Sequence, residues 1–566
     1  MKKPLNIIYG ADDTPPLAVT VFSGLQHVAL ISINLIFPVL VLKAVDAPVQ
    51  AVIGYLAVSM MVLGVGTFLQ ASRVGPLGTG FMCPSTYTSG YLAPSLLAAN
   101  LGGLPLVFGM TIFAGAVEAV LAPLLNRLRA IFPPEIAGLV IFMIGWSAAN
   151  AGLRMLVGGQ AAPVSGVEWA VAGFSLSIMV ALNVWGSGLA RMLCGLIGLV
   201  AGYTAALLTG LFDDATRNAV SNAPWFGLPA LGHASWSFDL SLTAAFAIGA
   251  VAATMKGVAT IAVCERTNDA DWVRPSMRLA RRGVLADGIT TVIAGLAGAL
   301  GTSTYTASAG LAASTGVASR KVAFAVGYIF LVLGFLPKLG ACLAVMPRSV
   351  MAAALLFAMC SVIVNGIQII ASRLLDARRT IVIATAIIFG GAVEIFPKLV
   401  ASLPAAAESV VGSSLVSATV IALGLNLLFR FGVKKTVTLT LEHGKVESPK
   451  VEEFFKARGA AWGARPEVIS RATFGVIQLV DAVRGEFWHR GAIEIKASFD
   501  EFSLNVDLAY DGDALEFPEQ RPTNKQIRES EDGARLMAGF MLRKCADRLR
   551  SQSKDGRANV HLHYDH

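Results

Sequence analysis

Between residues 16 and 431 the sequence consists almost entirely of apolar stretches, most of them long enough to cross a lipid bilayer. A helix needs roughly 20 predominantly apolar residues to span the hydrocarbon core. Charged residues are scarce in this region and become abundant after Val433. Because 55% of the 566 residues are hydrophobic and only 14% are charged, most of the chain would be insoluble as a water-facing globule. The sequence therefore predicts a polytopic membrane protein followed by a soluble domain.

The apolar stretches fall into two sets of seven. Their approximate bounds are 17–42, 49–71, 82–100, 104–125, 132–156, 168–188 and 191–213, then 240–264, 284–300, 304–317, 321–345, 349–371, 380–396 and 408–431. An odd number of spans in each set places the two halves in opposite orientations in the membrane. We therefore expect an all-α membrane domain over 1–432, with 14 transmembrane segments as a 7+7 inverted repeat, and a cytoplasmic α/β domain over 433–566.

The basic residues predict the orientation of the chain. Connections after even-numbered spans are rich in arginine, as at Arg278, Arg281 and Arg282, whereas the opposite side carries few basic residues. Cytoplasmic loops carry an excess of lysine and arginine. We therefore expect both termini in the cytoplasm and the spans in a bacterial inner membrane. Trp225, before span eight, is typical of an interfacial anchor. The net charge of +8 then reflects topology and predicts no nucleic-acid partner.

One unusual string occurs twice, once in each half. Ser85-Thr86-Tyr87-Thr88 and Ser303-Thr304-Tyr305-Thr306 lie within apolar sequence, each after a Gly-Thr pair. The stretches that contain them are short or interrupted, as expected for half-helices. Hydroxyls and glycines at corresponding places in two halves indicate broken helices whose backbone lines a central binding site. This pattern predicts a secondary transporter.

Several motifs resemble those of the nucleobase–ascorbate transporter family, the uracil/xanthine permeases, over about 17–431. Gln26-His27 on span one resembles the Gln-His pair of the family, and Pro133-Pro134-Glu135 and Ala286-Asp287-Gly288 fit the openings of spans five and nine. The segment 307–316 aligns with the signature on helix ten. Its residues Gly310, Thr315 and Gly316 match that signature, whereas Ala307 and Ser308 stand where the family has Gln or Glu and Asn.

The resemblance implies a core domain, spans 1–4 and 8–11, that moves against a gate domain, spans 5–7 and 12–14. It implies elevator-type alternating access, uptake of uracil, xanthine or uric acid, frequent symport with protons, and a homodimer. In such proteins a glutamate on helix eight and a glutamate or glutamine on helix ten grip the base.

Lys256 departs most sharply from the family. It lies inside the apolar stretch 240–264, where a charged side chain costs about 3 kcal/mol or more. The alignment places Lys256 where the binding glutamate usually stands, and Thr260 where the family has an aspartate. Lys256 either faces the binding cavity or snorkels to the cytoplasmic interface. Glu265 competes for the acidic role, but we interpret it, with Asp269 and Asp271, as a cytoplasmic loop charge.

The remaining features of the expected site favour a negatively charged ligand. Ala307 cannot hydrogen-bond a base, so Ser308 and the backbone from Tyr305 to Gly310 would supply donors and acceptors. A half-helix N-terminus favours anions, and Lys256 adds a full positive charge. Uric acid and xanthine, which ionise relatively easily, fit this site better than neutral uracil. We assign no cofactor and no metal; proton or sodium coupling is open, although no carboxylate at the site supports it.

Four further residues have two interpretations each. His27 either packs in the core or orients the ligand, and Gln26 beside it projects about 100° away on a helix. Tyr87 and Tyr305 either stack on a planar ligand or pack between half-helices. Glu118, in span four, either pairs with Lys256 or makes hydrogen bonds in helix packing.

After Val433 the pattern becomes that of a soluble α/β domain. We expect strands at 436–441, 493–499, 502–508 and 558–564, and helices at 466–489 and 533–551. This order, with Asp511-Gly512-Asp513, resembles the histidine-kinase-type ATPase fold of anti-sigma factors. Asp481 replaces the Mg-binding asparagine of that fold, and its usual second glycine is absent. We expect a regulatory or dimerising module. The terminal histidines His561, His563 and His566 alternate as on a strand and could bind metal, but we interpret them as a frayed tail.

Three functions therefore compete. The first is a nucleobase transporter, the second a small-anion transporter on the same architecture, and the third a ligand sensor that signals through its C-terminal domain. Gln26-His27 and the signature remnant favour the first, whereas Lys256 and Ala307 favour the second. The sequence has no Walker loop, no HExxH motif and no nucleophile elbow with partners, so we do not expect an enzyme.

Overall fold

The structure is a computed structural model of the whole chain. Contacts within the chain divide it into two compact units, Met1–Leu425 and Asn426–His566, here called the membrane unit and the C-terminal unit. The structure describes residues 2–5, 7–131, 133–157, 165–229, 235–272, 275–371, 375, 377–396, 414–429, 435–442, 448–462, 464, 466–483, 490–499, 503–512, 517–521, 533–554 and 556–565.

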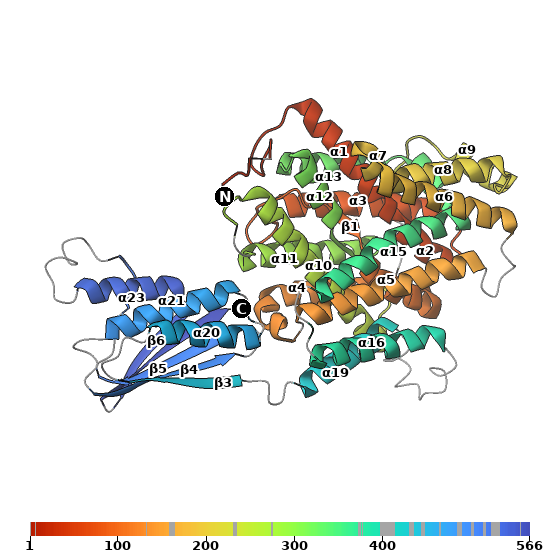
Figure 1. Ribbon diagram of the computed structural model, residues 1–566. Helices are drawn as coiled ribbons and strands as arrows, with labels where there is room; N and C mark the ends of the chain where they lie inside the picture. Colours follow the sequence, from red (N-terminus) through yellow and green to blue (C-terminus); the bar gives the residue numbers. More distant parts are fainter. Residues whose placement is uncertain are drawn as a thin grey trace. The chain divides into compact units, whose positions relative to one another are not determined.

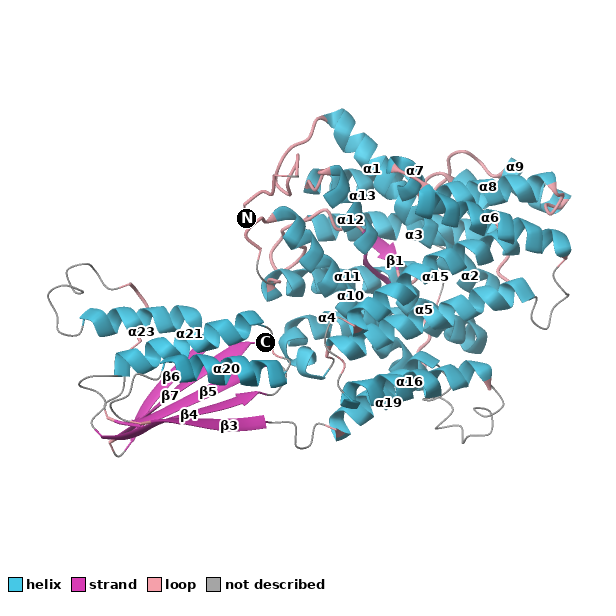
Figure 2. Ribbon diagram, viewed as in Figure 1, coloured by secondary structure: helices cyan, strands magenta, loops and turns pink. Residues whose placement is uncertain are grey.

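Apart from two three-residue strands, the regular elements in the described part of the membrane unit are helices (Figures 1 and 2). In the first half the elements are α1 (Leu17–Ser32), η1 (Ile33–Leu35), α2 (Ile36–Ala44), α3 (Val49–Ala71), β1 (Ser85–Tyr87), η2 (Ser89–Tyr91), α4 (Leu92–Ile131), α5 (Pro134–Val157), α6 (Gly166–Trp185), α7 (Gly188–Met192), α8 (Cys194–Leu208) and α9 (Asp214–Asn222). In the second half they are η3 (Leu240–Leu242), α10 (Thr243–Asn268), α11 (Met277–Ala297), β2 (Thr302–Thr304), α12 (Thr306–Thr315), α13 (Arg320–Leu333), α14 (Pro337–Ala344), α15 (Arg348–Ile370), α16 (Ala377–Ile395) and α19 (Ser414–Leu428).

Seven described helices are long and apolar enough to cross a membrane, or eight if α13 and α14, bent by 82°, form one broken span. The expectation of a mostly helical polytopic fold is confirmed, whereas the count of 14 crossings stays a prediction. The predicted third and fourth stretches meet in one element, α4, at a non-helical residue, Gly103 (φ 67°, ψ −163°). The prediction of an all-helical membrane domain is wrong at β1 and β2, because both twin strings contain an extended segment.

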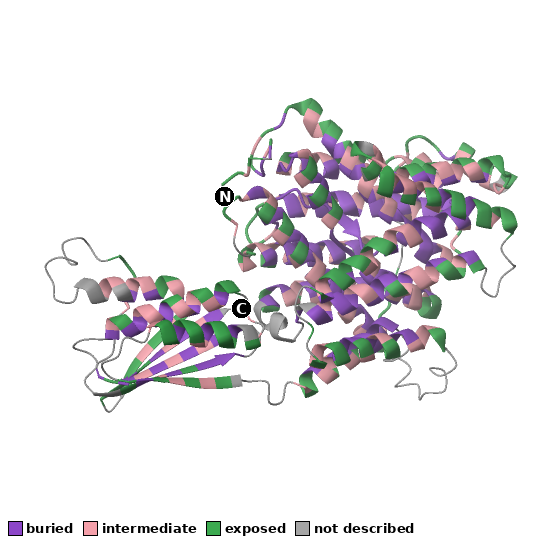
Figure 3. Cartoon of the chain, in the orientation of Figure 1, coloured by how far each residue is buried: buried purple, intermediate pink, exposed green. Residues whose placement is uncertain are grey.

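The membrane-unit helices pack in two groups. In one group α4 lies along α11 and α3 along α13; in the other α5 lies along α15 and α6 along α8. The interior of the unit is buried, while large apolar side chains such as Val184, Leu208 and Ile388 remain exposed on the outside (Figure 3). Exposed apolar side chains around a buried interior are expected of helices that face lipid.

Glycines allow α4 and α11 to approach closely. A Cβ built on Gly288 would lie 2.6 Å from the backbone nitrogen of Ala119, and one on Gly115 would lie 2.7 Å from the Gly288 carbonyl oxygen. Backbone atoms therefore occupy the space that any larger residue would need. Small residues at such interfaces let membrane helices pack by direct backbone contact.

We expect Gly288→Leu to prevent α4 and α11 from packing and to destabilise the protein by about 3 kcal/mol or more, as severe overpacking does. Thermal unfolding of the detergent-solubilised variant, followed by size-exclusion chromatography, measures this loss. Gly424→Leu is the matched control, because a Cβ at Gly424 meets nothing within 4 Å. Equal unfolding temperatures for the two variants would contradict the close contact.

Residues 7–13 form a strap along the connection between α12 and α13. The Tyr9 N–H donates to the Gly316 carbonyl (2.9 Å), the Ala318 N–H to the Tyr9 carbonyl (2.8 Å) and the Arg320 N–H to the Ala11 carbonyl (3.0 Å). The Lys3 ammonium donates to the Asp13 carboxylate (2.9 Å), and this hydrogen bond lowers the pKa of Asp13.

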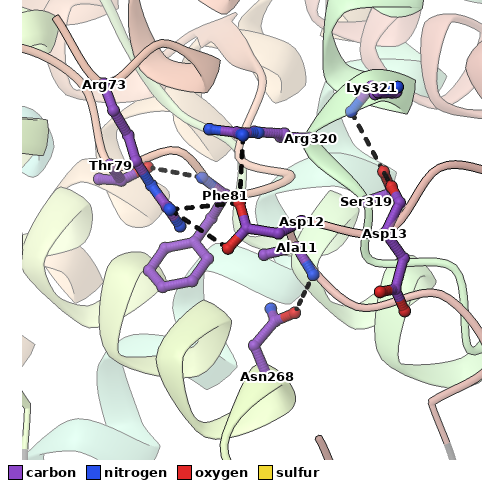
Figure 4. Close-up of polar contacts among 10 residues, drawn as sticks. All are labelled: Ala11, Asp12, Asp13, Arg73, Thr79, Phe81, Asn268, Ser319, Arg320 and Lys321. Atoms are coloured by element: carbon purple, nitrogen blue, oxygen red, sulfur yellow. Dashed lines mark hydrogen bonds and ion pairs between the residues drawn. The ribbon is translucent and has the colours of Figure 1, made fainter. Parts of the chain in front are cut away.

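The strap also reaches the ends of α3 and α10. Asp12 lies between Arg73 and Arg320, with a carboxylate oxygen 3.2 Å from each guanidinium (Figure 4). The Ala11 N–H donates to the buried Asn268 side chain at 2.8 Å, and the Asn268 amide donates to the Cys264 carbonyl. The strap therefore ties the end of α12 to the ends of α3 and α10.

We expect Asn268→Leu to release the strap, because the buried Ala11 N–H would lose its acceptor at a cost of about 1–3 kcal/mol. Hydrogen exchange at residues 9–12 should become about tenfold faster or more, since each 1.4 kcal/mol corresponds to a factor of ten. Thr267→Ala, one position earlier and only half-buried, is the control, because the Thr267 hydroxyl donates to the Val263 carbonyl of its own helix and not to the strap. Unchanged protection in Asn268→Leu would show that the strap is held by other contacts.

The C-terminal unit is a five-stranded antiparallel sheet in the order β3-β4-β5-β7-β6, with helices on one face (Figure 2). Its elements are β3 (Lys435–Leu441), α20 (Ser448–Trp462), α21 (Pro466–Val483), β4 (Arg490–Phe499), β5 (Ser503–Asp511), α23 (Gly533–Cys545), β6 (Arg548–Lys554) and β7 (Arg557–Asp565). The core joins Val476 of α21 to Val506 and Val560 of the sheet.

Two expectations for this unit are wrong. The helix expected at 533–551 ends at Cys545, and β6 follows, paired with β7 from Arg548 to Lys554. The supposed frayed tail is the strand β7, in which the His561 ring bonds Asp507 (2.6 Å) and the His563 ring bonds Asn505 (2.7 Å). Helix α20 was not expected. Asp513, His566 and the expected helix end at 484–489 lie outside the described residues.

Candidate functional site

The twin strings pair with each other. Strands β1 and β2 are antiparallel and fully buried, and their partners are Ser85↔Thr304, Thr86↔Ser303 and Tyr87↔Thr302. The Tyr305 N–H extends the contact by donating to the Pro84 carbonyl (3.0 Å). Each strand leads into a helix, β1 through η2 into α4 and β2 into α12. The pair therefore brings the N-termini of two half-helices together inside the membrane unit.

Neighbouring helices hold this pair in place. The Asn34 amide, in the break between α1 and α2, donates to the Thr86 hydroxyl at 2.8 Å. The backbone N–H of Thr304 donates to the Asp287 carboxylate at 3.2 Å. The Gln70 amide donates to the other oxygen of Asp287 at 2.8 Å. Asp287 has no exposed surface, so a buried carboxylate on α11 anchors β2 to α3.

Lys256 lies on α10, half-buried, and interacts electrostatically with Asp287 and Glu118. In the part of the chain that the structure describes, its ammonium group has no hydrogen bond or ion pair within bonding distance. A half-buried cation near two buried carboxylates, with donors to spare, is suited to an incoming anionic or acceptor-rich group. Lys256 therefore lies close enough to the buried acids of α11 and α4 to interact with them electrostatically.

Glu118 makes the hydrogen bond that one of its two interpretations expects. The Tyr91 hydroxyl donates to one carboxylate oxygen at 3.2 Å, and the other oxygen has no partner among the described residues. The interaction of Glu118 with Lys256 is electrostatic rather than a direct ion pair. Glu118 is thus a second buried acid that interacts with Lys256 without pairing with it directly.

The side chains of Gln26 and His27 differ in burial, as expected for neighbours that point about 100° apart on a helix. His27 is fully buried, and neither ring nitrogen has a partner among the described residues. Gln26 beside it is half-buried. An orphaned buried imidazole is costly, so His27 has hydrogen-bonding capacity that its protein surroundings do not use.

The two tyrosines differ in role. Tyr87 is fully buried and donates to the Ser59 carbonyl at 2.8 Å, so it packs β1 against α3. This contact is the packing that one of the two interpretations of Tyr87 expects. Tyr305 is half-buried and lies near the Asn34 side chain. It stays a candidate at the start of α12.

The residues expected on helix ten lie on two sides of α12. Ala307 and Gly310 are exposed, and a Cβ built on Gly310 would meet nothing within 4 Å. Ser308 is buried, and its hydroxyl has no partner among the described residues. The Thr306 and Thr260 hydroxyls lie 2.7 Å apart and join α12 to α10. The first turn of α12 therefore has open space on one side and unused hydroxyl capacity on the other.

Asp287 and Gln70 have no predicted role in the binding site. Asp287 was noted only as part of a motif, although an acid in an apolar stretch is itself a signal of function. It supplies a carboxylate that we did not assign to the site. Glu265 was interpreted as a loop charge, and this is wrong, because it is buried in the last turns of α10. There it accepts from the Ser276 N–H (2.8 Å) and from the Trp272 indole (3.3 Å).

Among solved structures, the chain is similar to the transmembrane domain of BicA, a cyanobacterium bicarbonate transporter. The TM-score is 0.48 at 16% identity, covering 73% of this chain and 97% of that one. It is also similar to SLC26A9, with a TM-score of 0.48 at 10% identity, covering 76% of this chain and 68% of that one.

Curated relatives are more similar in sequence. XanP of Escherichia coli, a xanthine permease, is 26% identical over 441 residues, 75% of this chain and 94% of XanP. PucJ of Bacillus subtilis, a uric acid permease, is 28% identical over 432 residues, 73% of this chain and 93% of PucJ. A candidate purine permease of Clostridium perfringens, CPE0397, is 29% identical over 429 residues, 75% of this chain and 94% of that protein.

The model of the xanthine and uracil permeases, described as "Permease family", matches residues 18–399. The match covers more than half of the chain, including the twin strings, Lys256 and Asp287. The resemblance inferred from Gln26-His27 and the helix-ten signature is confirmed. The chain belongs to the xanthine/uracil permease family and is a multi-pass membrane transporter, not an enzyme.

Proposed function

We propose that this protein is a secondary transporter that carries a purine nucleobase, of the xanthine or uric acid class, by alternating access. The observation that supports this most is the β1–β2 pair, which joins two half-helices beside Lys256 and Asp287. Relatives named as xanthine and uric acid permeases support the substrate class. Uracil is a weaker candidate, because the site carries a cation where the family has an acid.

Lys256 and the first turn of α12 would hold the ligand. The positive N-terminal end of α12 and the Lys256 ammonium favour an anionic or acceptor-rich heterocycle. Tyr305, Ser308 and the open space beside Gly310 would complete the site, and His27 and Gln26 would orient the ligand from α1. A ligand bound this way would interact with the Lys256 ammonium in competition with the carboxyl groups of Asp287 and Glu118.

The two groups of packed helices would move against each other. The core would comprise α1–α4 and α10–α14, and the gate α5–α8, α15, α16 and α19. Binding at the edge of the core would let the site face each side in turn, as in transporters built from inverted repeats. We further propose a homodimer in a bacterial inner membrane with both termini cytoplasmic. Proton or sodium coupling would use Asp287 or Glu118, the two buried acids that interact electrostatically with Lys256.

The C-terminal unit would act as a regulatory or dimerising module. Its helices cover one sheet face, and its other face carries charged side chains such as Glu494, Lys496 and Arg557. Asp481 lies exposed on α21, and Asp511 ends β5. Nucleotide binding by this unit would require these two carboxylates to take the roles that the ATPase resemblance assigns to them.

A small-anion transporter is the second candidate, because Lys256 and the short side chain of Ala307 provide charge without base-specific hydrogen bonding. A thermal-shift screen of purines, pyrimidines and small anions separates the two. The proposal expects stabilisation by uric acid and xanthine that is lost in Lys256→Glu. Stabilisation by bicarbonate or sulfate alone would replace it with the second candidate.

A further inference from the structure

An apolar groove lies outside the candidate site, between α8, α9 and α14. Its volume is about 640 Å³, and Leu199, Val200, Leu207, Val220 and Leu343 supply most of its apolar lining. Val200 and Leu207 are each more than half exposed. A groove of this kind on a membrane protein is open to a lipid chain.

The charges that line this groove are all of one sign. Arg217 of α9 and Lys338 of α14 are its two charged lining residues, and no carboxylate lines it among the described residues. Lys338 donates to the Ser221 carbonyl at 3.1 Å and lies 5.1 Å from the centre of the Trp225 ring. The ammonium is therefore fixed at the rim of the groove and keeps further donor capacity.

The nearby acids do not neutralise Arg217. Asp213 accepts from the Thr216 N–H at 2.8 Å and caps the start of α9. Asp213 and Asp214 lie outside the groove lining, and no ion pair joins either to Arg217 among the described residues. Arg217 is exposed, so its guanidinium can contact an anion at the groove rim.

The neighbouring aromatic residues fit the depth at which lipid headgroups lie. Trp225 and Phe226 follow α9 and are 69% and 77% exposed, as interfacial anchors are. The apolar end of the groove then faces the acyl region, and its cationic end the headgroup region. This arrangement matches an amphipathic molecule with one negative head.

We infer that this groove binds an anionic phospholipid, with an acyl chain along α8 and α14 and the headgroup phosphate between Arg217 and Lys338. A second copy of the chain is a poorer occupant. A twofold interface brings the same patch of both subunits together, so Arg217 and Lys338 would face their own copies. A zwitterionic lipid would bring its own cation to the cationic rim.

The test uses the full chain in nanodiscs that contain phosphatidylglycerol and phosphatidylcholine with identical acyl chains. Native mass spectrometry of the released protein counts the retained lipids of each class. We expect about a tenfold preference for phosphatidylglycerol, since hydrogen bonds to charged groups are the strong ones. In Arg217→Gln/Lys338→Gln the preference should fall to about twofold or less. Arg191→Gln, which removes an exposed cation from α7, should leave it unchanged.

Three results would overturn the inference. The first is that the unchanged protein retains the two lipids equally. The second is that the double variant keeps its preference for phosphatidylglycerol. The third is that the double variant loses a dimer while its lipid retention is unchanged. If the double variant does not fold, Val220→Trp fills the groove and keeps both cations. Phosphatidylglycerol retention should then fall at least about fivefold, and a normal value would refute the site.

Discussion

Lys256→Glu should lower the affinity for uric acid at least about 100-fold. The substitution removes a charge-assisted hydrogen bond worth about 1.5–3 kcal/mol and adds a negative charge beside Asp287 and Glu118, which already interact with Lys256. Each 1.4 kcal/mol is a factor of ten in affinity. Isothermal titration with the purified protein measures this loss.

Lys256→Met separates the charge from the shape of the side chain. Methionine keeps an unbranched chain without the ammonium, so we expect an intermediate loss of about tenfold. Lys321→Met, on α13 and exposed, is the matched control and should bind normally. If Lys256→Glu binds uric acid as the unchanged protein does, Lys256 faces away from the ligand and the anionic assignment fails.

Asp287→Asn should abolish uptake and lower the stability of the membrane unit by about 1–3 kcal/mol, the usual cost of leaving a buried hydrogen-bond donor without its acceptor. The carboxylate accepts from the Gln70 amide and from the Thr304 N–H. An asparagine presents only one acceptor oxygen to these two donors. Thermal unfolding and uptake are measured on the same preparation.

A double variant tests whether Asp287 and Lys256 form a charge pair. Removing both charges should restore part of the stability, so Lys256→Met/Asp287→Asn should unfold at a higher temperature than Asp287→Asn alone. Asp269→Asn, in the loop after α10, serves as the control for the carboxylate change. Additive losses in the double variant would show that the two residues are energetically independent.

The sequence was sufficient to predict the helices and the importance of the twin strings. Apolar length alone located α3 and α15, because a lipid-facing helix must satisfy its backbone internally. The repeated string containing Tyr87 and Tyr305 predicted broken helices in both halves, and both occur. Gln26-His27 and the helix-ten remnant led to the permease family. Each of these signals lies within a short segment, so it can be recognised from a single sequence.

The remaining features depend on contacts between distant segments. Nothing local in Thr86 or Ser303 shows that they pair across more than 200 positions as antiparallel strands. The anchoring of β2 by Asp287 depends on α3 and α11 lying side by side. Burial of Tyr87 likewise depends on the neighbouring Ser59 carbonyl. In the C-terminal unit, the predicted helix extends into β6 because apolar and polar residues alternate only weakly there. The pairing of β6 with β7 decides its structure.

Uptake of labelled uric acid and xanthine into liposomes that contain the purified protein tests the transport proposal most directly. We expect saturable uptake that excess unlabelled xanthine blocks, that an imposed ion gradient makes concentrative, and that Lys256→Glu reduces to the level of protein-free liposomes. Binding without uptake would identify a sensor. Uptake of bicarbonate or sulfate without uptake of uric acid or xanthine would identify an anion carrier. Either of these two results would contradict purine transport.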